Sequence, residues 1–279
     1  MMVAASSLIG MTTIIAKILG QGFQGESLHP LQVTAGRFVF ALLTLFLFYT
    51  FRRFEIKSTN YKIHFGRSLM GWLGVSCMFA AVKFIPVSDA ISISFMNPVI
   101  AMLIAIPFLK EQVGGTRWLA ALISFAGALI LLRPGFDNFQ WTTLLAFGAA
   151  FFLGFEVILI KKLSSLESPL QILIINNCIG CILSLTAAFF VWNTPNPRQW
   201  AELIALGVIM VSAQSLFIQS MRSGDASYVL PFSYMTIVFA AVYDFLIFTT
   251  KPDWISVIGA IIIVSGAILL GTREIFKQS

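Results

Sequence analysis

Apolar stretches of about 20 residues recur from one end of the chain to the other and are joined by short connections. A stretch of that length, wound as an α-helix, crosses a hydrocarbon core of about 30 Å. Charged residues make up 11% of the sequence and the mean hydropathy is +0.90, whereas soluble domains carry about 25% charged residues. The pattern predicts an all-α membrane protein of about ten transmembrane helices.

Breaks at Gly, Pro and charged residues mark the ends of the apolar stretches. Connections such as Pro86 to Ser88 are too short for a soluble domain. The first stretch has no basic residue before Lys17, so we expect a retained helix rather than a cleaved signal. The predicted spans cover residues 2–19, 30–51, 67–85, 88–109, 116–133, 141–160, 169–192, 200–220, 226–248 and 254–272.

Short motifs recur between the two halves of the chain. Asp89-Ala90 returns as Asp225-Ala226, and Trp118 returns as Trp254 at the same spacing. This duplication predicts two domains, residues 1–135 and 136–279, with helices 1–5 and 6–10. An odd number of helices in each half makes the second half enter the membrane inverted, an architecture typical of transporters with a site near the bilayer midplane.

The repeated region also resembles a known family. The first half contains IPVSDAISISFMNPVIAMLIAIPFLKEQVGGTRWLAALISFAGALILLRPG, from Ile85 to Gly135. The second half contains GDASYVLPFSYMTIVFAAVYDFLIF followed by WISVIGAIIIVSGAILLGTRE. These segments resemble the EamA domain of the drug/metabolite transporter (DMT) superfamily. One departure is that Leu109-Lys110-Glu111 fits the family pattern, whereas Phe248 to Pro252 lacks the corresponding acid.

The resemblance implies ten helices in two inverted five-helix EamA repeats, no cofactor, and transport of small organic metabolites. Family members export amino acids and drugs, and others take up S-adenosylmethionine or riboflavin. We therefore expect a secondary transporter that moves an amino acid or related amine metabolite by alternating access. An uptake carrier for S-adenosylmethionine or a riboflavin-like cofactor is the alternative.

The basic residues indicate the orientation and the partners. With the N-terminus inside, most loop Lys and Arg residues, Arg67 included, fall on the cytoplasmic side. We predict a multi-pass protein of the bacterial inner (plasma) membrane with both termini in the cytoplasm. The net charge of +6 is dispersed among the loops, which disfavours nucleic acid. The expected partners are a small metabolite, the lipid bilayer, and a coupling proton or counter-substrate.

Ionisable residues inside spans are costly and therefore mark functional sites. Arg37 is the strongest candidate, because its guanidinium can pair with a substrate carboxylate or phosphate. Its alternatives are snorkelling to the interface or a structural pair with Asp89 or Asp244. Those two acids are candidates for a gate or for coupling.

Glu156 is a third gate or coupling candidate. Its alternative role is a snorkelling carboxylate paired with Lys161 and Lys162 at the cytoplasmic end of its helix.

Uncharged polar groups near the middle of spans can hydrogen-bond a ligand at lower cost than charges. Pro98 and Pro231 interrupt the fourth and ninth spans at comparable depths, which points to a site at those helices. Contact between packed helices is the other interpretation. The substrate-binding candidates beside Arg37 are Asn97, Pro98, Asn176, Gln214, Tyr228 and Tyr234, and Trp72 is a further stacking candidate.

Other classes of function fit less well. An integral membrane enzyme acting on lipid-linked substrates needs a catalytic cluster, but the sequence has no HExxH, GxSxG or P-loop motif. We expect His29 and His64 in loops, and Cys178 and Cys181 in helix packing, with no catalytic or metal site. A channel needs rings of polar groups along a pore, and the polar groups here are sparse.

Overall fold

The computed structural model describes residues 1–22, 26–51, 60–81, 87–133, 143–249 and 253–278, and this part of the chain is helical with short connections. The elements are α1 (Met2–Gln21), α2 (Pro30–Phe51), α3 (Tyr61–Ala81), α4 (Val87–Ser94), α5 (Asn97–Leu109), α6 (Gly115–Leu132), α7 (Thr143–Leu166), α8 (Pro169–Ala188), η1 (Phe189–Val191), α9 (Pro197–Ser223), α10 (Ala226–Val229), η2 (Leu230–Tyr234), α11 (Met235–Phe248) and α12 (Trp254–Gln278).

The predicted all-α membrane fold is confirmed. Among the described residues, nine helical segments are long and apolar enough to cross a bilayer. The predicted third span corresponds to α3, whose first turns carry Lys62, His64 and Arg67 and so lower its hydropathy. The expected domain boundary at residues 135 and 136 lies outside the described residues.

Two expectations about the start of α3 were wrong. His64 and Arg67 were assigned to a loop, yet both lie inside the helix and are buried, with exposed fractions of 1% and 2%. Each has an acidic partner on another part of the chain: His64 contacts Glu167, and Arg67 lies near Glu156. A charged residue next to an apolar stretch is typical of a loop. The acidic partners that allow burial here are distant in sequence, so the local pattern does not reveal them.

The fourth and ninth spans are interrupted, as their prolines suggested. The chain breaks between α4 and α5 at Phe95 and Met96, and η2 replaces α-helix around Pro231. The two breaks face each other, because the Tyr234 hydroxyl donates a hydrogen bond to the Phe95 carbonyl over 2.9 Å. The interruption therefore leaves a carbonyl that the other half of the chain satisfies.

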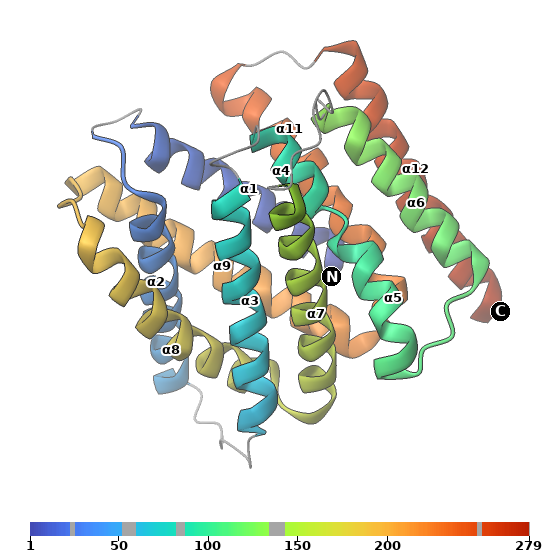
Figure 1. Cartoon of the computed structure of the whole chain (residues 1–279), viewed down its shortest axis with the longest axis horizontal. Coiled ribbons are helices and arrows are strands. Elements are labelled where there is room, and N and C mark those ends of the chain that lie inside the picture. The colour runs from blue at the N-terminus through green and yellow to red at the C-terminus, as the bar shows by residue number, and fades with distance from the viewer. Residues whose placement is uncertain (23–25, 52–59, 82–86, 134–142, 250–252, 279) are drawn as a thin grey trace.

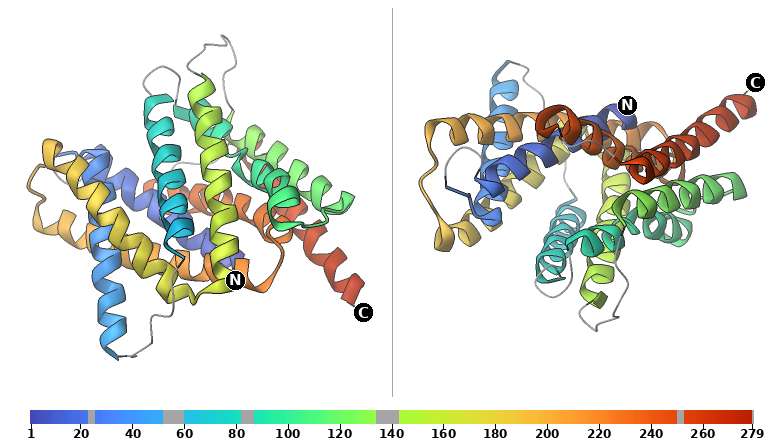
Figure 2. Two further views of the ribbon diagram at one scale, coloured as in Figure 1. Left: turned by 60° about the horizontal axis from the view of Figure 1, so that its bottom comes forward. Right: turned by 90° about the horizontal axis from the view of Figure 1, so that it is seen from above.

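The helices pack in pairs that join the two halves of the chain. α6 and α12 lie side by side over their length, as do α3 and α7, while α2 contacts both α8 and α9 (Figure 1; Figure 2). Glycine permits the closest of these contacts. A Cβ added at Gly127 of α6 would lie 2.8 Å from the Gly259 carbonyl oxygen of α12, and one at Gly259 would lie 2.8 Å from the Leu131 nitrogen.

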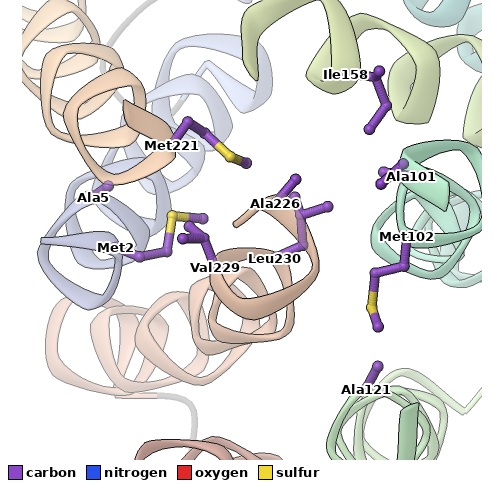
Figure 3. Close-up of a cluster of buried hydrophobic side chains, with 11 residues drawn as sticks. Met2, Ala5, Ala101, Met102, Ala121, Ile158, Met221, Ala226, Val229 and Leu230 are labelled. Carbon is purple, nitrogen blue, oxygen red and sulfur yellow. The ribbon is translucent and has the colours of Figure 1, made fainter. Parts of the chain in front are cut away.

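An apolar cluster fills the space between α1, α5, α6, α7, α9 and α10. Met2, Met102, Ile158 and Met221 meet there with small residues, and α10 contributes Val229 (Figure 3). The second half of the fourth span and the start of the ninth therefore pack into an apolar core.

An ion pair ties α12 to the end of α6 at the protein surface. The Arg133 guanidinium donates to Asp253 and to the Ser256 hydroxyl. The Ser256 hydroxyl also donates to Asp253, and the hydrogen bonds from Arg133 and Ser256 lower the pKa of this exposed carboxyl to about 2.

Candidate functional site: a charged cavity between α2, α3, α7 and α8

A cavity of about 260 Å³ lies between α2, α3, α7 and α8, with one residue from α9. It extends from Leu31, at the start of α2, and Ala187, at the end of α8, down to Ser68 and Asn176. Beyond Ser68 and Asn176, the first turns of α3 and α8 carry the buried side chains of His64, Arg67, Gln171 and Ile172, so this end of the cavity is closed and we call it the blind end. The lining residues on which the site depends are Arg37, Ser68, Trp72, Glu156, Asn176 and Gln214.

Arg37 enters the cavity from α2, two turns after the helix begins. Its Cζ lies 4.5 Å from the centroid of the Phe38 ring, a cation–π arrangement that supports the guanidinium. Phe38 in turn packs on Gly180 of α8, where a Cβ would clash with the ring. Glu156 of α7, an acid of opposite charge, lines the same cavity.

Glu156 lies in the middle of α7, and its carboxylate packs against α3. A Cβ at Gly71 would lie 3.0 Å from the Glu156 Cδ, so a larger residue there would force the carboxylate to shift. Its side chain is 21% exposed, while the partner Arg67 is 2% exposed. Arg67 Nε is 3.7 Å from Glu156 Oε1, which is an ion-pair distance but too long for a hydrogen bond.

The expected pairing of Glu156 with Lys161 is wrong. Lys161 instead donates to the Met221 and Gly224 carbonyls at the end of α9, over 2.6 and 2.5 Å. Glu156 points to α3 and the cavity, where Arg67 supplies an opposite charge and Gly71 leaves space for the carboxylate.

Two polar atoms along the cavity lack a hydrogen-bond partner among the described residues. They are the Ser68 hydroxyl and the Gln214 Oε1, and both atoms are buried. A buried polar atom without a partner costs about 1–3 kcal/mol. A ligand with donor groups would recover part of that cost, so these atoms favour a polar ligand over an apolar one.

The structure places the other predicted substrate-binding residues away from this cavity. Tyr234 is fully buried between Phe95 and Phe125, with ring centroids 6.3 and 6.2 Å away. Tyr228 packs edge-on against Phe232 at 5.6 Å in the apolar cluster. Asn97 and Pro98 begin α5, and the Asn97 carbonyl faces Gly154 of α7.

The two aspartates predicted as gate or coupling residues have different positions. Asp244 of α11 accepts from Lys17 of α1 over 2.5 Å, and the Lys17 Nζ lies 4.5 Å from the centroid of Phe248. Asp89 belongs to α4, but its side chain lies outside the described part of the structure.

Sequence patterns did not identify Arg67 or Ser68 as site residues. Arg67 had the signal of an ionisable residue next to an apolar run, but it was assigned to a loop. Ser68 carries no distinguishing signal, because a serine in an apolar span commonly bonds its own helix.

Comparison with known proteins identifies the family. The sequence profile of the EamA-like transporter family matches residues 1–133 and again residues 140–272. The chain belongs to the EamA-like transporter family. It is also similar to a protein of known crystal structure, with 18% sequence identity and a TM-score of 0.78. The match covers 96% of this chain and 98% of the other chain. That similarity supports the fold of this EamA-like chain.

Curated relatives are named for different substrates. The chain is 26% identical over 264 residues to a "S-adenosylmethionine uptake transporter" of Rickettsia bellii, covering 94% of this chain and 91% of the relative. It is 30% identical over 228 residues to a "Riboflavin transporter" of Vibrio cholerae, covering 81% and 76%. It is 26% identical over 213 residues to the "Pseudopaline exporter CntI" of Pseudomonas aeruginosa, covering 75% and 74%. Its family consists of transporters rather than enzymes, and the chain is a multi-pass membrane transporter.

Proposed function

We propose that this EamA-like protein carries a small metabolite with both an amino group and a carboxylate, by alternating access through the charged cavity. The single observation that carries the proposal is that Arg37 of α2 and Glu156 of α7 line one cavity. Arg37 would bind the carboxylate, because a guanidinium offers two parallel hydrogen bonds to it. Glu156 would bind the ammonium group.

The size and lining of the cavity support an amino-acid-sized substrate. Its volume of about 260 Å³ lies just below the usual range of about 300–1,000 Å³ for small-molecule pockets. Trp72 and Phe38 present apolar surface for a side chain, while Asn176, Gln214 and Ser68 offer hydrogen bonds. The charges bind the two ends of the ligand, and the rest of the cavity accepts its body.

S-adenosylmethionine is a second candidate, because it carries an amino group and a carboxylate and because a relative that covers 91% of its own length is named for it. A riboflavin-like substrate would make less use of Arg37 and Glu156, since it has neither charge. In both cases the aromatic side chains would stack on the flat ring.

We further propose that the protein lies in a bacterial inner membrane with both termini in the cytoplasm, as the distribution of loop Lys and Arg residues supports. The cavity would then open toward the outer face. Transport would be coupled to a proton or exchanged for a counter-substrate, with Glu156 as the coupling candidate that the cavity supports best. Asp244, which is paired with Lys17, is a candidate for a gate outside the cavity.

Counterflow in proteoliposomes tests the substrate class with matched compounds. The set consists of an amino acid, its decarboxylated amine, its N-acetylated derivative, S-adenosylmethionine and riboflavin. We expect saturable counterflow for the amino acid and a large loss for the two derivatives that lack one charge. Equal flux of the amino acid and its N-acetylated derivative would contradict the role of Glu156, and flux with riboflavin alone would replace the proposed substrate class.

A further inference from the structure

Two helix–helix contacts occupy equivalent positions in the two repeats but are packed differently. We call each such contact a seam. The second and third spans of the first half are α2 and α3, and those of the second half are α8 and α9. The seam between α2 and α9 therefore corresponds to the seam between α8 and α3. The α2–α9 seam is closely packed: a Cβ at Gly36 would lie 2.7 Å from the Leu203 Cδ2, and one at Gly207 would lie 2.7 Å from the Ala41 nitrogen.

The α3–α8 seam is open where its counterpart is closed. Gly71 and Val75 of α3 face the cavity, as do Asn176 and Gly180 of α8. The described hydrogen bonds that join the start of α3 to Glu167, just before α8, and to Ile172, in the first turn of α8, lie at the blind end of the cavity, below Ser68.

A buried polar cluster forms that contact. His64 Nε2 and Glu167 Oε2 are 2.9 Å apart, with side-chain exposures of 2% and 3%. Glu167 also accepts from the Asn60 backbone nitrogen over 3.1 Å and from Gln171 Nε2 over 2.8 Å. We call Asn60, His64, Glu167 and Gln171 the floor cluster.

Arg67 lies between the floor cluster and the cavity. Its Nη1 donates to the Ile172 carbonyl of α8 over 3.5 Å, and its Nε lies 3.7 Å from Glu156 Oε1. Both contacts are long, and neither the Arg67 Nε nor the His64 Nδ1 has a hydrogen-bond partner among the described residues. Arg67 is therefore held only loosely to α8 and to Glu156, so a change of charge at Glu156 can shift its position.

We propose that the floor cluster is the gate at the blind end of the cavity, and that Arg67 is the positioning residue that couples this gate to Glu156. While Glu156 is ionised and unoccupied, it holds Arg67 against α8 and the floor stays closed. When a ligand cation neutralises Glu156, Arg67 loses its counter-charge and α3 and α8 separate at their first turns. The neutralisation of Glu156 by a ligand cation rests on the proposed function, whereas the gate formed by the floor cluster does not.

The gate can be tested without a substrate. In a chain whose three cysteines are replaced by serine, Ser68→Cys provides a thiol just above the floor. Sealed vesicles of both orientations are treated with a membrane-impermeant thiol reagent, and the measured quantity is the ratio of blind-side to open-side labelling rates. Using the ratio cancels changes in the reactivity of the thiol itself.

We expect Glu167→Gln to raise this ratio at least tenfold, because an amide has one accepting oxygen, whereas both carboxylate oxygens of Glu167 accept hydrogen bonds. Arg133→Gln is the matched control, since it removes an exposed arginine–aspartate pair far from the floor, and the ratio should stay unchanged. A Glu167→Gln protein with normal open-side labelling and no gain from the blind side would overturn the gate.

A double-mutant cycle tests the coupling. Glu156→Gln imitates a carboxylate neutralised by a cation, so we expect it to raise the ratio as Arg67→Gln does, with no further rise in the double variant. Glu156→Gln without effect, or effects that multiply in the double variant, would overturn the role of Arg67. Because no substrate is present, failure here would leave the counterflow results for the proposed function intact.

Discussion

Replacing Arg37 separates substrate recognition from a structural role. Arg37 lines the same cavity as Glu156, and its guanidinium lies over the Phe38 ring. Arg37→Gln keeps a polar side chain but removes the charge and the bidentate donor pair. A hydrogen bond to a charged group contributes about 1.5–3 kcal/mol. At about 1.4 kcal/mol for each tenfold change in affinity, this loss corresponds to about a 10- to 100-fold rise in KM.

The assay is uptake into proteoliposomes with an amino acid substrate and, in parallel, its decarboxylated amine. Arg37→Gln should raise the apparent KM for the amino acid by that factor, while the weak transport of the amine should change little. Arg37→Lys keeps the charge but loses the second donor, so we expect a smaller rise of about tenfold. Arg133→Gln, which removes an exposed arginine, should match the unsubstituted protein.

A gate role for Arg37 gives a different result. If Arg37 closed a gate with Asp244, exchanging the two charges would restore uptake, but Asp244 is already paired with Lys17. We therefore expect no restoration. Wild-type kinetics for the amino acid in Arg37→Gln would refute substrate recognition and leave only interfacial snorkelling.

Three further predictions follow from the packing and the topology. Tyr234→Phe removes the hydrogen bond to the Phe95 carbonyl, so it should lower the unfolding free energy by about 1 kcal/mol in a detergent titration. The KM should change little, and a large change in KM at normal stability would contradict a purely structural role. Gly127→Ala places a Cβ 2.8 Å from the Gly259 carbonyl and should lower the melting temperature, whereas Gly20→Ala, with open space around it, should have a much smaller effect. An introduced Cys at Gln278 should be labelled only from the cytoplasmic side, and labelling from the opposite side would reverse the proposed orientation.

The fold could be predicted because each span carries its own signal. Length and apolarity identify a membrane helix without knowledge of its neighbours, and Pro98 and Pro231 mark the two interrupted spans. The start of α3 could not be predicted in this way. Arg67 and His64 are buried because Glu156 and Glu167 lie beside them in the folded chain, and no local pattern contains those partners.

The candidate site was only partly predictable, for a similar reason. Polar residues in apolar spans could be identified one by one, but their chemistry does not reveal which of them meet. Gln214 and Asn176 reach the cavity, whereas Tyr234, which also carries a polar group within a span, joins the two helix breaks through its hydroxyl. The role of Gly71 could not be predicted either, because it depends on the Glu156 carboxylate that packs against it in the folded chain.

An experimental structure with a substrate identified by counterflow tests the central claim most directly. We predict ligand density in the cavity between α2, α3, α7 and α8, with the carboxylate within hydrogen-bond distance of the Arg37 guanidinium and the amino group beside Glu156. Density at the helix breaks, near Asn97 and Tyr234, with Arg37 and Glu156 free of ligand, would contradict it.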